Sequence, residues 1–62
     1  MTQEQLRRVD RVNLYASVCK GIMPINYGRF AILNENEREL CLQSAENLIN
    51  KIKAEQKQAS LN

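Results

Sequence analysis

Hydrophobic residues recur at alternating spacings of three and four between residues 4 and 20, a pattern that predicts an amphipathic helix. Thr2 can cap this helix, because its hydroxyl accepts a hydrogen bond from an amide of the first turn. Gly21 and Pro24 end it, since glycine favours a left-handed stop and proline cannot continue a helix. One apolar seam of the predicted helix comprises Val9, Val12, Ala16 and Cys19.

A second apolar side of the same helix carries Leu14 and Val18. Two apolar sides are more than one neighbouring helix can cover. Surplus apolar surface on a small chain usually marks a contact with another molecule. We therefore expect this side to meet a second subunit or a partner protein.

Residues 27–33 are rich in aromatic and β-branched residues and are bounded by turn formers, which predicts one short β-strand. The chain offers no second candidate strand, and a lone strand leaves its backbone donors and acceptors unpaired. Antiparallel pairing with the same strand of a second copy, about a two-fold axis, would satisfy them. An extended loop packed on the helices is the alternative.

A second helix is predicted over residues 35–56, because Asn34 followed by Glu37 is typical of a capping box. Residues 58–62 lack periodicity and are expected to fray. The apolar seam of this helix comprises Cys41, Ala45, Leu48 and Ile52, widened by Leu42 and Ile49.

These elements predict a mainly α fold with one short strand, in a single domain spanning residues 1–62. A chain this short buries only about 60% of its unfolded surface, so it commonly needs a staple or a second subunit. We expect helix-strand-helix subunits that form an intertwined symmetric homodimer, with strands pairing antiparallel across the two-fold. The predicted dimer interface comprises Val9, Val12, Ala16, Cys19, Phe30, Ile32, Leu42, Ala45, Leu48, Ile49 and Ile52.

Catalytic and metal chemistry find little support in the residue types present. The chain has no histidine, and its two cysteines, Cys19 and Cys41, lack both a C-x-x-C spacing and an activating neighbour. Core cysteines, kept reduced in a cytosolic protein, are the favoured interpretation, and the start of the chain does not resemble a signal peptide. The glutamates at the start of the second helix fit caps and a solvated face better than a metal site: Glu35, Glu37 and Glu39. We expect no enzymatic activity and no cofactor, metal or small-molecule ligand.

The charge balance argues only weakly for nucleic acid. Nine basic against seven acidic residues give a net charge of +2, below what phosphate-gripping domains usually carry. Arg7 and Arg11 lie one helical turn apart, and Arg29 would project from a strand ribbon. A small dimeric nucleic-acid-associated regulator using these three arginines is therefore kept as an alternative. No apolar run approaches the roughly 20 residues of a membrane span.

The strongest functional signal is the surplus apolar surface. Leu14, Val18, Met23 and Tyr27 could line a groove for an amphipathic helix of another protein. Alternatively, dimerisation covers all of them. The two interpretations stay open at this point.

The segments Thr2 to Val12 and Gly21 to Phe30 resemble the sixty-odd-residue early proteins encoded between the exonuclease and excisionase genes of phage lambda and related toxin-carrying phages. The resemblance covers essentially the whole chain. It implies a dimer of subunits with two helices and one strand, made early in infection in the bacterial host cytoplasm. It also implies a role in favouring lytic development, through contact with a host or phage factor, and transfers no site residue.

The stretch Ser44 to Asn50 is also similar in character to the helical-hairpin chaperones of type III secretion systems. That resemblance implies a helix-loop-helix chain that holds a partner in a heterodimer. The predicted strand with Gly28 counts against it.

Overall fold

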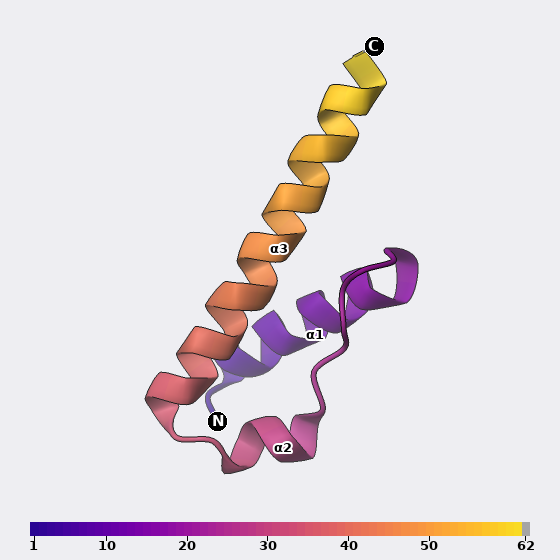
Figure 1. Cartoon of the computed structure of the whole chain (residues 1–62). Helices are drawn as coiled ribbons and strands as arrows, with labels where there is room; N and C mark the ends of the chain where they lie inside the picture. Colours follow the sequence, from indigo (N-terminus) through magenta and orange to yellow (C-terminus); the bar gives the residue numbers. More distant parts are fainter. Residues whose placement is uncertain (62) are drawn as a thin grey trace.

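Three helices make up the chain in the computed structural model, which describes the backbone of residues 1–61 and the side chains of residues 1–56. They are α1 (Gln3–Val18), α2 (Tyr27–Ile32) and α3 (Glu35–Leu61). Figure 1 shows α2 below the other two and the C-terminal half of α3 projecting beyond them. The molecule is accordingly elongated, with extents of 44 × 20 × 18 Å.

α1 and α3 pack side by side and run in the same general direction (Figure 1). Arg8 near the start of α1 bonds Glu39 and Glu46 early in α3, and Tyr15 near its end lies under Lys53 further along α3. Because two parallel neighbours cannot be joined by a tight turn, residues 19–34 carry the chain back to the start of the pair. This return segment contains α2.

The hydrophobic core closes within one chain, in two clusters. The first contains Val9 of α1, Phe30 of α2 and Leu42 of α3. The second contains Val12, Ile22 and Ile49. Each cluster draws side chains from α1, the return segment and α3, and burying one such side chain is worth about 1.5–3 kcal/mol. A single copy therefore hides its largest core residues without a partner.

The predicted N-cap of α1 is confirmed. The Thr2 hydroxyl accepts the Gln5 amide at 3.1 Å, and the Gln5 side chain accepts the Thr2 amide at 3.2 Å, a complete capping box. The helix ends at Val18, two residues before the predicted end. Gly21 adopts the predicted positive φ, +96°, but the helix has already ended in the extended backbone of Cys19, so this glycine shapes the following loop.

The strand predicted at residues 27–33 is a helix in the structure, and residues 1–61 contain no strand. Local hydrogen bonding explains this outcome. The Asn26 side chain accepts the Arg29 amide at 3.0 Å, and the Asn26 carbonyl accepts the Phe30 amide at 2.9 Å. A six-residue helix thus satisfies backbone groups that a lone strand would leave unpaired. The single chain therefore does not present the strand at these residues, and antiparallel pairing with a second copy stays a prediction.

The start of α3 follows the prediction and its end does not. The Asn34 side chain accepts the Glu37 amide at 2.8 Å, and the Glu37 carboxylate accepts the Asn34 amide at 3.1 Å, which confirms the capping box. α3 continues through Gln56 to Leu61, so residues 58–61 of the predicted frayed tail are helical. Asn62 lies outside the described residues. Within the part described, no helix has the length and apolar character needed to cross a membrane.

Candidate functional site

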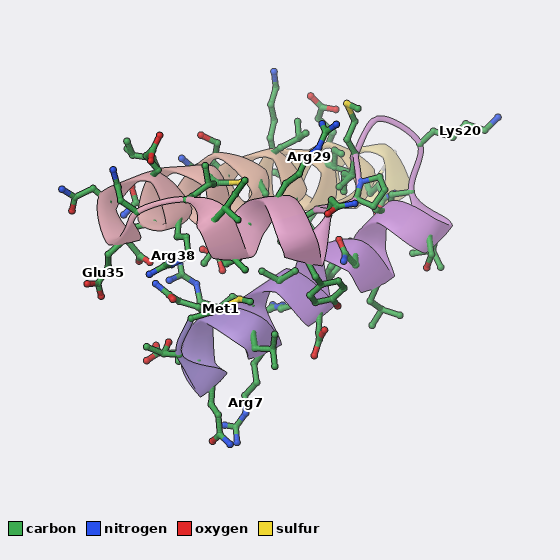
Figure 2. The ribbon with its side chains drawn as sticks, turned by 90° about the horizontal axis from the view of Figure 1, so that it is seen from below. Met1, Arg7, Lys20, Arg29, Glu35 and Arg38 are labelled. Carbon is green, nitrogen blue, oxygen red and sulfur yellow. The ribbon has the colours of Figure 1, made fainter. Side chains whose placement is uncertain are left out.

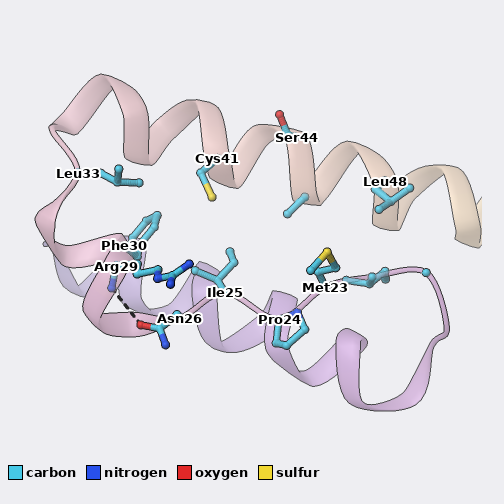
Figure 3. Close-up of a pocket in the computed structure, with 13 residues that line it drawn as sticks. Met23, Pro24, Ile25, Asn26, Arg29, Phe30, Leu33, Cys41, Ser44 and Leu48 are labelled. Atoms are coloured by element: carbon cyan, nitrogen blue, oxygen red, sulfur yellow. Dashed lines mark hydrogen bonds between the residues drawn. The ribbon is translucent and has the colours of Figure 1, made fainter.

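An open apolar groove of about 590 Å³ lies between the return segment and α3 (Figure 3). Its volume falls within the range of about 300–1,000 Å³ typical of ligand sites. The groove is lined by Gly21, Ile22, Met23, Pro24, Ile25, Asn26, Arg29, Phe30, Leu33, Cys41, Ser44, Ala45 and Leu48.

One wall of the groove is the return segment, which α1 holds in place. The Asn13 side chain donates to the Ile25 carbonyl at 3.1 Å and accepts the Ile25 amide at 2.7 Å. The Tyr27 hydroxyl donates to the Asp10 carboxylate, and this hydrogen bond raises the pKa of Tyr27. Asn13 therefore fixes the backbone of Ile25, and Asp10, one turn earlier on α1, anchors the side chain of Tyr27.

The opposite wall is one face of α3. Cys41, Ala45 and Leu48 follow one another at helical spacing, and Leu48 keeps 39% of its surface exposed. Phe30, only 1% exposed, and Leu33 line the end of the groove where α2 leads into α3 (Figure 3). The wall is thus a part of the α3 seam that the core of the chain covers only partly.

The rim of the groove combines an exposed apolar side chain with a cation. Met23 is 84% exposed although it borders the groove. Arg29 is the one charged residue among those that line it. Such a site offers dispersion and desolvation to an apolar ligand, with one guanidinium to orient it.

The residues predicted for a dimer interface divide into three groups. Five of them are buried in the core of the single chain: Val9, Val12, Phe30, Leu42 and Ile49. Four are half-buried against that core: Ala16, Cys19, Ala45 and Ile52. Only Ile32, 82% exposed, and Leu48 keep substantial apolar surface.

The predicted partner groove is only partly assembled. Met23 borders the observed groove, whereas Tyr27 is engaged with Asp10. Leu14 and Val18 are exposed on α1 and do not line the groove. Sequence reasoning missed the contributions of Ile25, Leu33 and Ser44, and assigned Ala45 and Leu48 to dimerisation. The signal that could have identified this wall is an α3 seam wider than one helix can cover.

The three arginines considered for nucleic acid do not share a surface. Arg29 and Arg7 point to opposite sides of the molecule in Figure 2. Arg11 borders a separate, smaller pocket of about 110 Å³, and it lies near Tyr15. Lys53, 4.8 Å from the centre of the Tyr15 ring, lowers the pKa of that phenol, with a smaller contribution from Arg11. A single basic face made of these three arginines is therefore not formed.

The two cysteines are free and half-buried, and they belong to different parts of the core. Cys41 packs against the Phe30 cluster and Cys19 against the Val12 cluster. Among the side chains of residues 1–56, no three histidine, cysteine, aspartate or glutamate residues gather as a metal site. The groove is thus the site whose chemistry the described residues define.

Comparison of the chain with models of protein families, with curated proteins and with solved structures finds no match. The geometry and chemistry of the groove are therefore the evidence on which a function rests.

Proposed function

We propose that this chain is a non-enzymatic binding protein whose groove holds an amphipathic helix of a partner protein. The observation that carries the proposal is the open apolar groove that persists after the chain has closed its own core. A ligand that covers Met23 and Leu48 would bind favourably, because each apolar side chain fully removed from water contributes about 1.5–3 kcal/mol.

The form of the α3 wall favours a helix as the occupant. Cys41, Ala45 and Leu48 repeat every three to four residues along the groove. A ligand helix presents apolar side chains with the same period, so its ridges can pack into the spaces between them.

Charge favours a partner over a second copy of this chain. The exposed apolar stripe of α1, Leu14 and Val18, continues toward the start of the helix as Arg11 and Arg7. If the stripe docked with its Arg7 end beside α2, those cations would lie near Arg29. Like charges held together in an apolar setting oppose association.

The resemblance to early phage proteins supports a role for this binding in lytic development, in the bacterial host cytoplasm, through a host or phage factor. The fraction of infected cells that become lysogens is expected to fall when the chain is expressed in a host infected with a temperate lambdoid phage. Leu48→Glu is expected to abolish that effect. If expression of the wild-type chain leaves the fraction of lysogens unchanged, the proposed lytic role is refuted. The proposal that the groove binds a helix would still stand.

A secretion chaperone is a second candidate, because one observation now favours it. The predicted strand that counted against a helical hairpin is the helix α2. Affinity purification of the tagged chain from bacterial lysate separates this candidate from the others. A secretion subunit in the eluate favours the chaperone, and nuclease-sensitive capture favours the nucleic-acid alternative.

The test of the groove is selection from a displayed library of roughly 15-residue helical peptides with apolar residues at helical spacing and random flanks. We expect the wild-type chain to enrich binders, and Leu48→Glu and Met23→Glu to lose them. Leu14→Glu, a charge introduced at an exposed position outside the groove, is the matched control and keeps them. Amide shifts at Ala45 and Leu48 on adding a selected peptide would locate the contact.

Two outcomes would overturn the proposal. One is a wild-type chain that enriches no peptide over Leu48→Glu. The other is a wild-type dimer in sedimentation equilibrium that Leu48→Glu converts to a folded monomer, because the occupant of the groove is then a second copy.

A further inference from the structure

The groove contains a guanidinium that is in no ion pair with a carboxylate of residues 1–56. Arg29 comes from α2, and its side chain lies in the groove beside Ile25 (Figure 3). Among the side chains of residues 1–56, neither ion pair involves it, and its one hydrogen bond to a side chain is made by its backbone amide to Asn26. Arg29 is exposed, and its charge is therefore available to another molecule.

Several carboxylates of the chain are engaged elsewhere. Glu39 and Glu46 both bind Arg8. Asp10 accepts the Tyr27 hydroxyl, and Glu37 accepts the Asn34 amide. Pairing any of these with Arg29 would require breaking a contact that orders the fold.

We infer that Arg29 pairs with a carboxylate of the docked helix, so the partner presents an apolar face flanked by an acidic residue. This inference rests on the proposed function of the groove and adds the charge of its ligand. A guanidinium binds a carboxylate through two parallel hydrogen bonds, which fixes orientation as well as attraction. The apolar walls strengthen such a pair, because a docked helix excludes water from it.

The position of Arg29 also orients the ligand. Arg29 belongs to the α2 side, whereas Cys41, Ala45 and Leu48 form the opposite wall (Figure 3). The apolar face of the docked helix therefore contacts α3, and its acidic residue lies on the flank that faces α2. A basic residue at the same place leaves two cations together under the cover of the helix, which selects against such ligands.

A purely structural role for Arg29 predicts a different result. Arg29 lies in the last turn of α2, where its charge complements the helix dipole. Arg29→Glu would weaken that interaction with any peptide bound. If Arg29 served only the helix dipole, however, a peptide with a basic residue in place of the acidic one would not bind Arg29→Glu any better.

The experiment uses the full chain and the displayed library of helical peptides with random flanks. Wild type is expected to enrich aspartate or glutamate at one flanking position, and Arg29→Glu to enrich lysine or arginine there. In titrations with one selected peptide, acid-to-lysine substitution at that position is expected to weaken binding to wild type by about tenfold or more. The Arg29→Glu variant is expected to bind the lysine-substituted peptide with most of the lost affinity restored. The Arg29→Lys variant is expected to keep the wild-type preference for an acidic residue.

The possible failures are distinguishable. Peptides that bind wild type and fail on Leu48→Glu, yet show no charge bias at any flank, overturn the inference and leave the groove intact. The inference is likewise overturned if Arg29→Glu weakens the binding of acidic and basic peptides equally. If no peptide is enriched over Leu48→Glu, the proposed function falls and the inference falls with it.

Discussion

Arg8 binds Glu46 through two hydrogen bonds, Nε to Oε2 at 3.0 Å and Nη2 to Oε1 at 2.7 Å, across 38 positions of sequence. The third nitrogen, Nη1, donates to both carboxylate oxygens of Glu39 at 2.7 and 2.9 Å. One guanidinium from α1 thereby binds two carboxylates that lie about two turns apart on α3. The side chain of Arg8 is 23% exposed, so solvent screens this network only in part.

Replacement of Arg8 by alanine is expected to lower the free energy of unfolding by about 1–2 kcal/mol, since two carboxylates lose charge-assisted hydrogen bonds. Urea denaturation followed by circular dichroism measures the change. Arg7→Ala removes a neighbouring exposed arginine from the same helix and is expected to change the value by less than about 0.5 kcal/mol. Equal effects of the two substitutions would contradict the role given to Arg8.

The same contact predicts how stability depends on pH. The hydrogen bonds from Arg8 lower the pKa of Glu46 below its ordinary value of 4.5. The unfolded chain therefore binds this proton more readily, so the stabilisation is fully present above the unfolded pKa and is lost as the pH falls through the folded pKa. Wild type is expected to be more stable than Glu46→Gln at pH 7, and the difference to shrink below pH of about 4. A difference that is constant from pH 7 to 3 would refute this linkage.

The helical state of residues 27–32 predicts opposite outcomes for two apolar residues two positions apart. Phe30 is buried between α1 and α3, whereas Ile32 is 82% exposed. Phe30→Ala is expected to cost about 3–5 kcal/mol, enough to unfold most small domains, and Ile32→Ala about 0.5 kcal/mol or less. Thermal melts of both variants decide the point. In a strand the two side chains would share one face, so similar losses would favour that arrangement.

Asn13 is expected to keep the return segment in the position that forms one wall of the groove. Asn13→Ala removes both hydrogen bonds to Ile25 and is expected to cost about 1–3 kcal/mol, because two backbone groups lose their partners. Hydrogen exchange at the Ile25 amide is expected to accelerate more than exchange at Leu42. Ser17→Ala, whose hydroxyl bonds only the Leu14 carbonyl of its own helix, serves as the control. Unchanged exchange at Ile25 would show that other contacts hold the segment.

The two glycines are expected to respond differently to alanine. Gly21 has φ +96°, so Gly21→Ala is expected to lower the free energy of unfolding by about 1 kcal/mol although the space around it is free. Gly28 lies inside α2 with ordinary helical geometry, where alanine gains up to about 1 kcal/mol of helix propensity. A new Cβ would lie 3.3 Å from Oδ1 of Asn26, which offsets part of this gain. The denaturant midpoint of Gly21→Ala is therefore expected to lie below that of Gly28→Ala, and equal midpoints would contradict the strain assigned to Gly21.

Features set by neighbours in sequence were predictable. The cap of α1 at Thr2, the left-handed Gly21 and the box between Asn34 and Glu37 each depend on residues within a few positions. The expectation of a strand weighed aromatic and β-branched content over residues 27–33 without the cap at Asn26, from which a helix begins in the single chain. Intrinsic β preference largely reflects packing, and here Phe30 packs as well from a helix.

The groove and its wall could not be predicted, because they depend on how the helices pack. The spacing of Val9 and Val12 identifies an apolar face without saying what covers it. The structure puts Phe30 and Leu42 against the first and Ile22 and Ile49 against the second. Which residues of the α3 seam remain open within one chain follows from that packing, and the spacing along the sequence does not contain it.

The return segment is both the sole covalent path from α1 to α3 and one wall of the groove. A ligand bound to this wall therefore also strengthens the connection between the two long helices. The same ligand does not bind the unfolded chain in this way. By mass action, a ligand at one hundred times its dissociation constant would add about 2.7 kcal/mol to the folded state. A rise in melting temperature on mixing is thus a label-free signal by which a natural partner can be recognised.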